Sequence, residues 1–130
     1  MRRVYIADDE PLLRKIVRKA GEMHGWEVTE CSDGRELLQS LGCVMTHGDG
    51  SGSIIFLDMQ MPGMDGIETL TQLAARQSGS AIYLMTGGSA ANAETAQMIG
   101  QAHGLHVTEI LAKPIPLKTL GRIFEAHNAA

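Results

Sequence analysis

The sequence predicts an α/β protein in which a parallel sheet is covered by helices on both faces. Five short apolar runs alternate with five helical patterns along the 130 residues. Such alternation is typical of parallel sheets, whose strands are joined by helical crossovers. Three of the apolar runs end directly on an acidic or hydroxyl side chain. We expect right-handed crossovers and a single domain over residues 1–130, because the sequence contains no internal repeat.

The first half of the chain holds three of the predicted strands. The elements are a strand over Val4–Ala7, a helix from Pro11 to Gly21, a strand over Trp26–Cys31, a short helix around Glu36–Leu41 and a strand over Ile54–Leu57. Pro11 suits the first turn of a helix, where its missing N–H needs no partner. The stretch Gly42–Ser53 is rich in Gly and Ser, which predicts a flexible loop.

The second half continues the same alternation. The elements are a helix over Gly66–Arg76, a strand over Ala81–Met85, a helix over Ala90–His103, a strand over His106–Ala112 and a helix over Leu117–His127. The last helix and the residues before it carry an apolar stripe. We expect this stripe to pack on the sheet, although it could also join two copies of the chain; it consists of Ile115, Leu117, Leu120 and Ile123.

Composition excludes several classes of function. A hydrophobic fraction of 44% is ordinary for a globular protein and argues against disorder. The net charge of −4 and only 4% aromatics argue against direct nucleic-acid binding, which needs a basic face or stacking rings. The first apolar run, Val4–Ala7, stops against three acids, whereas a secretory core needs about 7–15 apolar residues and a membrane span about 18. We therefore expect a cytoplasmic protein without a membrane segment. Cys31 and Cys43 are too far apart for a Cys-x-x-Cys motif, which predicts reduced structural thiols.

Polar side chains follow four of the predicted strands at the point where each strand ends. They are Asp8, Asp9 and Glu10 after the first strand, Asp58 after the third, Thr86 after the fourth and Lys113 after the fifth. The carboxyl ends of parallel strands share one edge of the sheet, and ligands bind there. If the strand order is 2-1-3-4-5, the first and third strands are neighbours, so their acids converge.

This set of side chains suits phosphoryl transfer. Crowded carboxylates raise one another's pKa unless a cation lies among them, and Mg²⁺ prefers carboxylates and water as ligands. Asp58 would then be a nucleophile, and Lys113 and Thr86 would bind the charge that develops on the phosphoryl oxygens.

The chain resembles a response-regulator receiver domain from end to end. The matching residues are Asp8-Asp9, the run Leu57-Asp58-Met59-Gln60-Met61-Pro62-Gly63-Met64-Asp65-Gly66, Thr86, and Lys113-Pro114. The resemblance implies a flavodoxin-like fold, a (βα)5 three-layer sandwich with strand order 2-1-3-4-5. It also implies that the chain is no enzyme beyond catalysing its own phosphorylation and dephosphorylation.

The resemblance assigns a role to each site residue. Asp58 would accept a phosphoryl group from a phosphohistidine and become an acyl phosphate. Mg²⁺ would be bound by the side chains of Asp9 and Asp58 and by the backbone carbonyl of Gln60, with Asp8 acting mainly through water. Lys113 would contact the phosphoryl oxygens.

Further expectations from the resemblance concern the switch. Thr86 would turn toward the phosphoryl group, and the Lys113-Pro114 bond would be cis, which only X-Pro bonds adopt cheaply. Many receivers have Tyr or Phe where this chain has Ile110, so the resemblance does not extend to a coupled rotation of threonine and ring. Gly88 replaces a larger side chain beside the acyl phosphate. Pro62 and the glycines Gly63 and Gly66 would shape the loop after Asp58.

The implied partners are a sensor histidine kinase or a histidine phosphotransfer protein, and a downstream protein target or fused output domain. Candidate residues for partner choice are Leu12, Leu13, Ile16, Pro114 and Ile115. Two alternatives stay open. Residues 88–116 resemble receivers fused to EAL-type cyclic-di-GMP phosphodiesterases, so the chain could be part of a larger regulator. It could also be an unphosphorylated dimerising scaffold.

Two other enzyme families fit poorly. A haloacid-dehalogenase-type phosphatase needs a second Asp where Gln60 stands. A flavodoxin needs a Ser- and Thr-rich phosphate loop in place of the acids and Pro11 that follow the first strand.

Overall fold

Strands and helices alternate along the chain in the order that the sequence predicts. The structure, a computed structural model, describes residues 2–44, 52–61, 64–88 and 90–129. The elements are β1 (Arg3–Ala7), α1 (Pro11–Met23), β2 (Glu27–Cys31), α2 (Gly34–Val44), β3 (Ile54–Asp58), α3 (Gly66–Ala75), β4 (Ala81–Thr86), α4 (Ala91–Ala102), β5 (His106–Ala112) and α5 (Leu117–Asn128). Most predicted bounds agree with these to within two residues.

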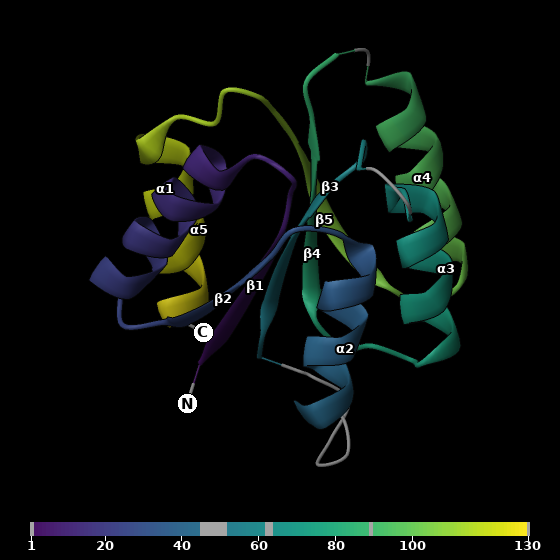
Figure 1. Cartoon of the computed structure of the whole chain (residues 1–130), viewed down its shortest axis with the longest axis horizontal. Coiled ribbons are helices and arrows are strands. Elements are labelled where there is room, and N and C mark those ends of the chain that lie inside the picture. The colour runs from purple at the N-terminus through teal and green to yellow at the C-terminus, as the bar shows by residue number, and fades with distance from the viewer. Residues whose placement is uncertain (1, 45–51, 62–63, 89, 130) are drawn as a thin grey trace.

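The strands form one parallel sheet of order β2-β1-β3-β4-β5, as predicted. Figure 1 shows the carboxyl ends of the strands meeting at the upper edge of the sheet. β1 and β3 are adjacent, with Ala7 paired to Leu57, and Asp58 is paired to Met85 of β4. β1 and β3 are therefore neighbours in the sheet although β2 lies between them in the sequence, and their carboxyl ends lie side by side.

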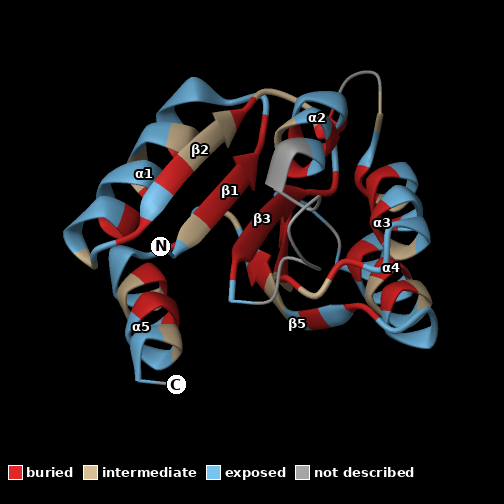
Figure 2. Ribbon diagram, turned by 90° about the horizontal axis from the view of Figure 1, so that it is seen from below, coloured by how far each residue is buried: buried red, intermediate tan, exposed pale blue. Residues whose placement is uncertain are grey.

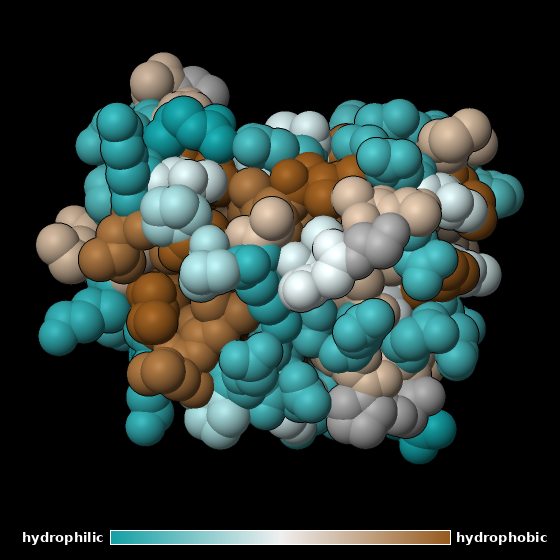
Figure 3. Space-filling view, turned by 90° about the horizontal axis from the view of Figure 1, so that it is seen from above, coloured by the Kyte–Doolittle hydropathy of each residue, from teal (hydrophilic) through white to brown (hydrophobic). Residues whose placement is uncertain are grey.

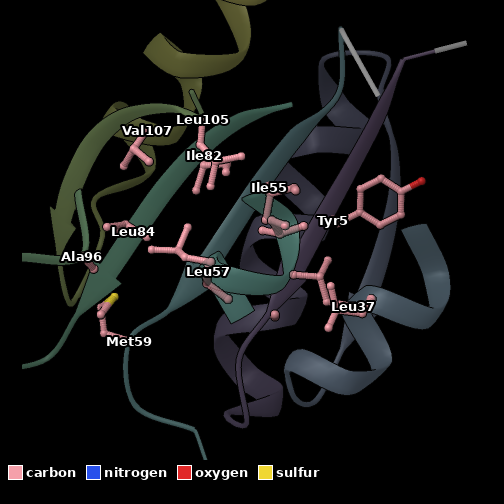
Figure 4. Packing of buried hydrophobic residues seen from close by; sticks show 14 of the residues in the cluster. Tyr5, Leu37, Ile55, Leu57, Met59, Ile82, Leu84, Ala96, Leu105 and Val107 are labelled. Carbon is pink, nitrogen blue, oxygen red and sulfur yellow. The ribbon is translucent and has the colours of Figure 1, made fainter. Parts of the chain in front are cut away.

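Helices cover both faces of the sheet, α1 and α5 on one and α2, α3 and α4 on the other (Figure 1). Alternate strand residues point to opposite faces, so each face has its own core. The α1/α5 core includes Val4, Ile6, Val17, Phe56, Leu120 and Phe124. The opposite core includes Tyr5, Leu37, Ile55, Leu57, Leu70 and Leu84, several of which are drawn in Figure 4. β3 is buried along its whole length, as expected for a central strand covered on both faces.

Figure 2 shows the helices with one buried and one exposed side each. In α1 the buried residues are Leu13, Val17, Ala20 and Gly21, which matches the helical spacing in the sequence. No helix in the described part of the chain has the length and apolar character needed to cross a bilayer.

Two sequence expectations need correction. α2 ends at Val44 rather than near Leu41, so the first residues of the predicted loop Gly42–Ser53 are helical. Leu41 is buried in the core, and the backbone stays helical from there to Val44. Residues 45–51 of that loop lie outside the described residues.

The second correction concerns the apolar stripe at α5. Ile115, Leu120 and Ile123 are buried in the α1/α5 core, as expected, but Leu117 is 68% exposed. It is the first residue of α5, and the helix turns its side chain away from the sheet.

Cys31 is a free, buried thiol. Burial raises the pKa of this thiol to about 11, which keeps it protonated. The side chain of Cys43 lies outside the described part.

Candidate functional site

The carboxyl edge of the sheet brings together the polar residues that end the strands. Asp8 follows β1 directly, Asp58 is the last residue of β3, Thr86 is the last residue of β4, and Lys113 follows β5. Parallel pairing in register fixes this arrangement: the backbone N–H of Asp8 donates to the carbonyl of Cys31 on one side.

Lys113 is the centre of the charge arrangement. Its ammonium nitrogen lies 2.8 Å from Oδ2 of Asp8 and 3.3 Å from Oδ1 of Asp58. Glu10 is the third acid in contact, with Oε1 also 3.3 Å from the same nitrogen. Asp8 has no exposed surface and Asp58 almost none, so a single cation balances two buried carboxylates.

The two buried carboxylates keep oxygens that the described residues do not fully satisfy with hydrogen bonds. Oδ1 of Asp8 accepts from the backbone N–H of Glu10 at 2.8 Å, whereas Oδ2 has the Lys113 ammonium nearby but no well-directed hydrogen bond among the described residues. Oδ1 of Asp58 accepts from the backbone N–H of Gln60 at 3.2 Å. Oδ2 of Asp58 has no donor in the described part of the chain.

Asp9 completes a three-acid cluster. One carboxylate oxygen from each of Asp8, Asp9 and Asp58 can be chosen so that all three lie within 4.8 Å of one another. Asp9 is exposed, while Asp8 and Asp58 are buried. The cluster therefore offers a set of oxygen ligands that is open to solvent on one side.

The electrostatics of the cluster follow from burial. Burial raises the pKa of Asp58, and the charge of Asp8 raises it further, against the opposing effects of the Gln60 N–H and Lys113. For Lys113 burial acts to lower the pKa, but the carboxylates of Asp8, Asp58 and Glu10 outweigh it and the pKa is raised. Lys113 is thus held in its charged form. The positive charge of Lys113 does not offset the burial of Asp58, and the pKa of Asp58 stays above its usual value.

Thr86 and Lys113 are joined through the backbone. The backbone N–H of Lys113 donates to the carbonyl of Thr86 at 2.8 Å, which ties the end of β5 to the end of β4. The Thr86 hydroxyl accepts from the N–H of Gly88 at 3.4 Å. The Lys113-Pro114 bond is cis, as expected.

The chain returns close to Asp58 where α3 begins. Gly66 donates its N–H to the carbonyl of Met59, and a Cβ at Gly66 would lie 2.9 Å from both Cα and Sδ of Met59 and 3.2 Å from the carbonyl oxygen of Asp58. Asp65 caps α3 by accepting from the N–H of Glu68. The expected roles of Pro62 and Gly63 lie outside the described residues.

A family model for the response regulator receiver domain matches residues 4–125 of the chain. The chain belongs to this family. As a receiver domain it is a module of two-component signal transduction, and the sandwich of order β2-β1-β3-β4-β5 is the expected flavodoxin-like fold.

Solved structures agree with this receiver domain over nearly its whole length. The chemotaxis protein CheY4 of Vibrio cholerae is 26% identical with a TM-score of 0.75, and the match covers 97% of this chain and 98% of that one. A response regulator from Colwellia psychrerythraea is 27% identical with a TM-score of 0.79, covering 99% and 98%.

Curated relatives are much longer than this receiver domain. The two-component response regulator ARR11 of Arabidopsis thaliana is 32% identical over 124 residues, which is 95% of this chain and 22% of that protein. The peroxide stress-activated histidine kinase mak3 of Schizosaccharomyces pombe is 30% identical over 123 residues, 91% of this chain and 5% of that protein. The receiver domain therefore spans a small part of these relatives.

Two features of the receiver domain lay beyond sequence reasoning. Glu10 was visible only as a third acid after β1, and its contact with Lys113 joins residues at opposite ends of the chain. Arg14 donates to the backbone carbonyl of Asp8 at 2.8 Å, and nothing in the local pattern marks it as part of the site.

Ile110, at the position where many receivers have a ring, is half-buried against the core on the α3 and α4 side.

Proposed function

We propose that this receiver domain accepts a phosphoryl group on Asp58, in a Mg²⁺-dependent reaction, from a histidine kinase or a histidine phosphotransfer protein. The observation that carries the proposal is the position of Lys113. Its ammonium contacts the buried carboxylates of Asp8 and Asp58 at one edge of the sheet, while Oδ2 of Asp58 has no donor among the described residues. A nucleophilic oxygen and a cation to bind the incoming charge therefore lie side by side.

The acidic cluster fits a hard divalent cation. Oxygens of Asp8, Asp9 and Asp58 approach within 4.8 Å of one another, and the buried Oδ2 of Asp8 lacks a well-directed hydrogen bond. Such oxygens are the ligands that Mg²⁺ prefers, together with retained waters. The Gln60 carbonyl is the proposed backbone ligand. When bound, the ion neutralises charge on the phosphoryl oxygens.

The residues of the chain then divide the chemistry of transfer. Oδ2 of Asp58 attacks phosphorus, and an O–P bond forms as the P–N bond of the donor phosphohistidine breaks. The bonding electrons leave with the imidazole nitrogen, which takes up a proton from solvent. Lys113 binds a phosphoryl oxygen, and Thr86, already linked to Lys113 through the backbone, brings its hydroxyl to another. The product is an acyl phosphate on Asp58, and hydrolysis of that bond restores the domain.

The kinase or phosphotransfer protein is proposed to dock beside α1. A groove of about 390 Å³ lies next to the site and is lined by Glu10, Leu12, Leu13, Ile16, Gly87, Lys113, Pro114 and Ile115. It includes all five residues that the sequence marks as candidates for partner choice. Figure 3, viewed onto the edge of the sheet that holds the site, shows apolar side chains gathered on the side of α1 and α5.

Charge favours an acidic surface on that partner. α1 carries four basic side chains and one acidic one, although the whole chain has a net charge of −4. Opposite charge on the partner would speed association and align the two surfaces.

We further propose that residues 1–130 act as one receiver domain in the cytoplasm. Its output is a conformational change that is recognised by a protein target or by a fused domain, such as an EAL phosphodiesterase. Pairing of two copies stays a prediction.

Labelled phosphotransfer in the presence of Mg²⁺ tests the proposal. Wild-type protein should become labelled by a phosphorylated histidine kinase, and the Asp58→Asn variant should not. Asp65→Asn is a matched control, because Asp65 is an exposed acid near the same loop and Asn caps a helix as well as Asp does. Labelling of Asp58→Asn at the wild-type level would refute the assignment of the nucleophile. Binding of beryllofluoride with Mg²⁺ separates a phosphorylated receiver from an unphosphorylated scaffold.

A further inference from the structure

Glu10 occupies the N-cap position of α1 but does not cap the helix. Short polar N-cap side chains such as Asp usually accept a hydrogen bond from one of the first backbone N–H groups of the helix. The side chain of Glu10 makes no such bond. It extends instead to Lys113, with Oε1 3.3 Å from the ammonium nitrogen. The carboxylate is therefore directed across the sheet edge, from the end of β1 to the end of β5.

The Lys113 ammonium is surrounded by carboxylates in this state of the domain, and its directed hydrogen bond goes to Glu10. It has three N–H donors, and it contacts three acids: Asp8 at 2.8 Å and Asp58 and Glu10 at 3.3 Å each. A phosphoryl oxygen that binds Lys113 competes with these carboxylates for the ammonium. Asp8 and Asp58 are held in the buried strand ends, whereas the side chain of Glu10 is 61% exposed. Of the three acids, Glu10 can leave Lys113 at the smallest cost in free energy, because water can solvate its exposed carboxylate.

We propose that Glu10 is a positioning residue that holds Lys113 in the unphosphorylated domain and releases it when the phosphoryl group arrives. This inference rests on the proposed function. In the resting state the Glu10 carboxylate competes with the phosphoryl oxygens for the ammonium, and its negative charge repels an incoming anion. Glu10 thus lowers the affinity of the site for phosphoryl groups without touching the reacting atoms.

The exchange also changes the surface where the partner is proposed to dock. Glu10 and Lys113 both line the groove between α1 and the segment after β5. When Lys113 turns to the phosphoryl group, Glu10 is left as an unpaired acid in the wall of that groove. Release of Glu10 therefore makes the groove more negative in the loaded domain than in the resting one.

Calorimetric titration with beryllofluoride at saturating Mg²⁺ tests the inference on the whole chain. Glu10→Gln keeps the size of the side chain and removes its charge. We expect this variant to bind beryllofluoride about two- to fivefold more tightly than wild type, the range that a partly exposed ion pair allows. Glu22→Gln is the matched control, because Glu22 is an exposed acid near the other end of α1, and its affinity should equal that of wild type.

Titration with Mg²⁺ alone adds a readout that a purely structural role would not produce. Without Glu10, Lys113 is shared only by Asp8 and Asp58, so Glu10→Gln should bind Mg²⁺ no more tightly than wild type while binding beryllofluoride more tightly. A variant damaged in its fold would lose affinity for both.

The outcomes distinguish the inference from the proposed function. Equal or weaker beryllofluoride binding by Glu10→Gln overturns the role of Glu10, and so does an equal gain in Glu22→Gln, which would trace the effect to net charge. If wild type itself binds no beryllofluoride with Mg²⁺, the proposed function fails and the role of Glu10 fails with it.

Discussion

The Lys113 ammonium lies 2.8 Å from Oδ2 of Asp8, a carboxylate with no exposed surface. Asp8 follows the first strand of the chain and Lys113 the last, so the contact spans the ends of β3 and β4, which lie between β1 and β5 in the sheet. A buried carboxylate without a cation is strongly destabilising. Lys113 therefore supports the fold of the domain as well as the charge of the site.

Replacement of Lys113 by Met should lower stability and raise the affinity for Mg²⁺. Without the ammonium, Asp8 and Asp58 lose their common counter-ion, and we expect a loss of about 2–3 kcal/mol in the free energy of unfolding, because the site is buried but not fully closed. Urea denaturation with and without Mg²⁺ measures both effects, since the ion should restore part of the loss by binding the folded state.

Lys118→Met is the control for that variant. Lys118 is an exposed residue of α5 with no ion pair among the described residues, so its replacement should change stability by less than about 0.5 kcal/mol. Equal stability of the Lys113 and Lys118 variants would contradict the structural role of Lys113.

Replacement of Asp58 by Asn should stabilise the domain at neutral pH in the absence of Mg²⁺. Burial, reinforced by the charge of Asp8, raises the pKa of Asp58 above its usual value of 3.8. The folded state therefore holds the proton more tightly than the unfolded state. The stability that this provides is complete below pH 3.8 and is lost as the pH rises through the folded pKa.

Asn cannot ionise and escapes this loss. We expect Asp58→Asn to be more stable than wild type by about 1 kcal/mol at pH 7, and the difference should shrink as the pH falls toward 3.8. Denaturation curves for both proteins across this pH range, with chelator present, measure it. A difference that stays constant with pH would show that Asp58 has its usual pKa.

Gly66→Ala should destabilise the domain and disturb the loop after Asp58. The new methyl group would lie 2.9 Å from Cα of Met59 and 3.2 Å from the carbonyl oxygen of Asp58, and backbone atoms cannot yield as a flexible side chain does. We expect a loss of about 1–3 kcal/mol, as for other overpacked sites, together with weaker binding of Mg²⁺. Thermal unfolding and a Mg²⁺ titration measure the two effects.

Gly42→Ala provides the opposite control in α2. A Cβ there would have its nearest neighbour, a guanidinium nitrogen of Arg76, at 3.8 Å, which is an ordinary contact. Alanine is the better helix former, so stability should rise by about 0.5–1 kcal/mol. If both alanine variants behave alike, the close approach at Gly66 does not constrain the loop.

Asn128→Ala should loosen the end of α5. Oδ1 of Asn128 accepts from the indole N–H of Trp26 at 2.9 Å, and its Nδ2 donates to the carbonyl of His24 at 3.0 Å. Loss of the amide leaves the buried indole N–H without this partner, and we expect a cost of about 1–2 kcal/mol. Trp26 is the single tryptophan of the chain, so its emission should also shift to longer wavelength.

Asn92→Ala is the control for the loss of an exposed amide. Asn92 lies on the exposed side of α4. The free energy of unfolding of this variant should stay within about 0.5 kcal/mol of wild type, and the emission spectrum of Trp26 should not change. An unchanged emission spectrum in Asn128→Ala would contradict the proposed contact with the indole.

The sequence by itself was sufficient to predict the fold class and the edge of the sheet that carries the site. Apolar spacing depends on neighbours a few residues away, so the strand at β3 and the buried side of α1 are visible in the sequence. The acids after β1 and β3 could be assigned to one edge because parallel strands share the direction of their ends.

The details of burial were less accessible, because they depend on contacts between distant segments. Leu117 fits the apolar stripe of α5, but its place at the start of the helix leaves it exposed. The length of α2 was underestimated because Gly42 and the Gly- and Ser-rich run after it indicate a loop in the sequence, whereas the helix runs to Val44.

The sequence determined which side chains stand at the ends of the strands, since local hydrophobic pattern marks where each strand stops. Only the tertiary structure decided how they share charge. Distances such as that from Glu10 to Lys113 depend on the strand order and on how α1 leaves β1, which no local pattern in the sequence specifies. With a different strand order the same acidic residues could have faced solvent. In this fold Lys113 contacts all three of Asp8, Asp58 and Glu10 and joins them into one site.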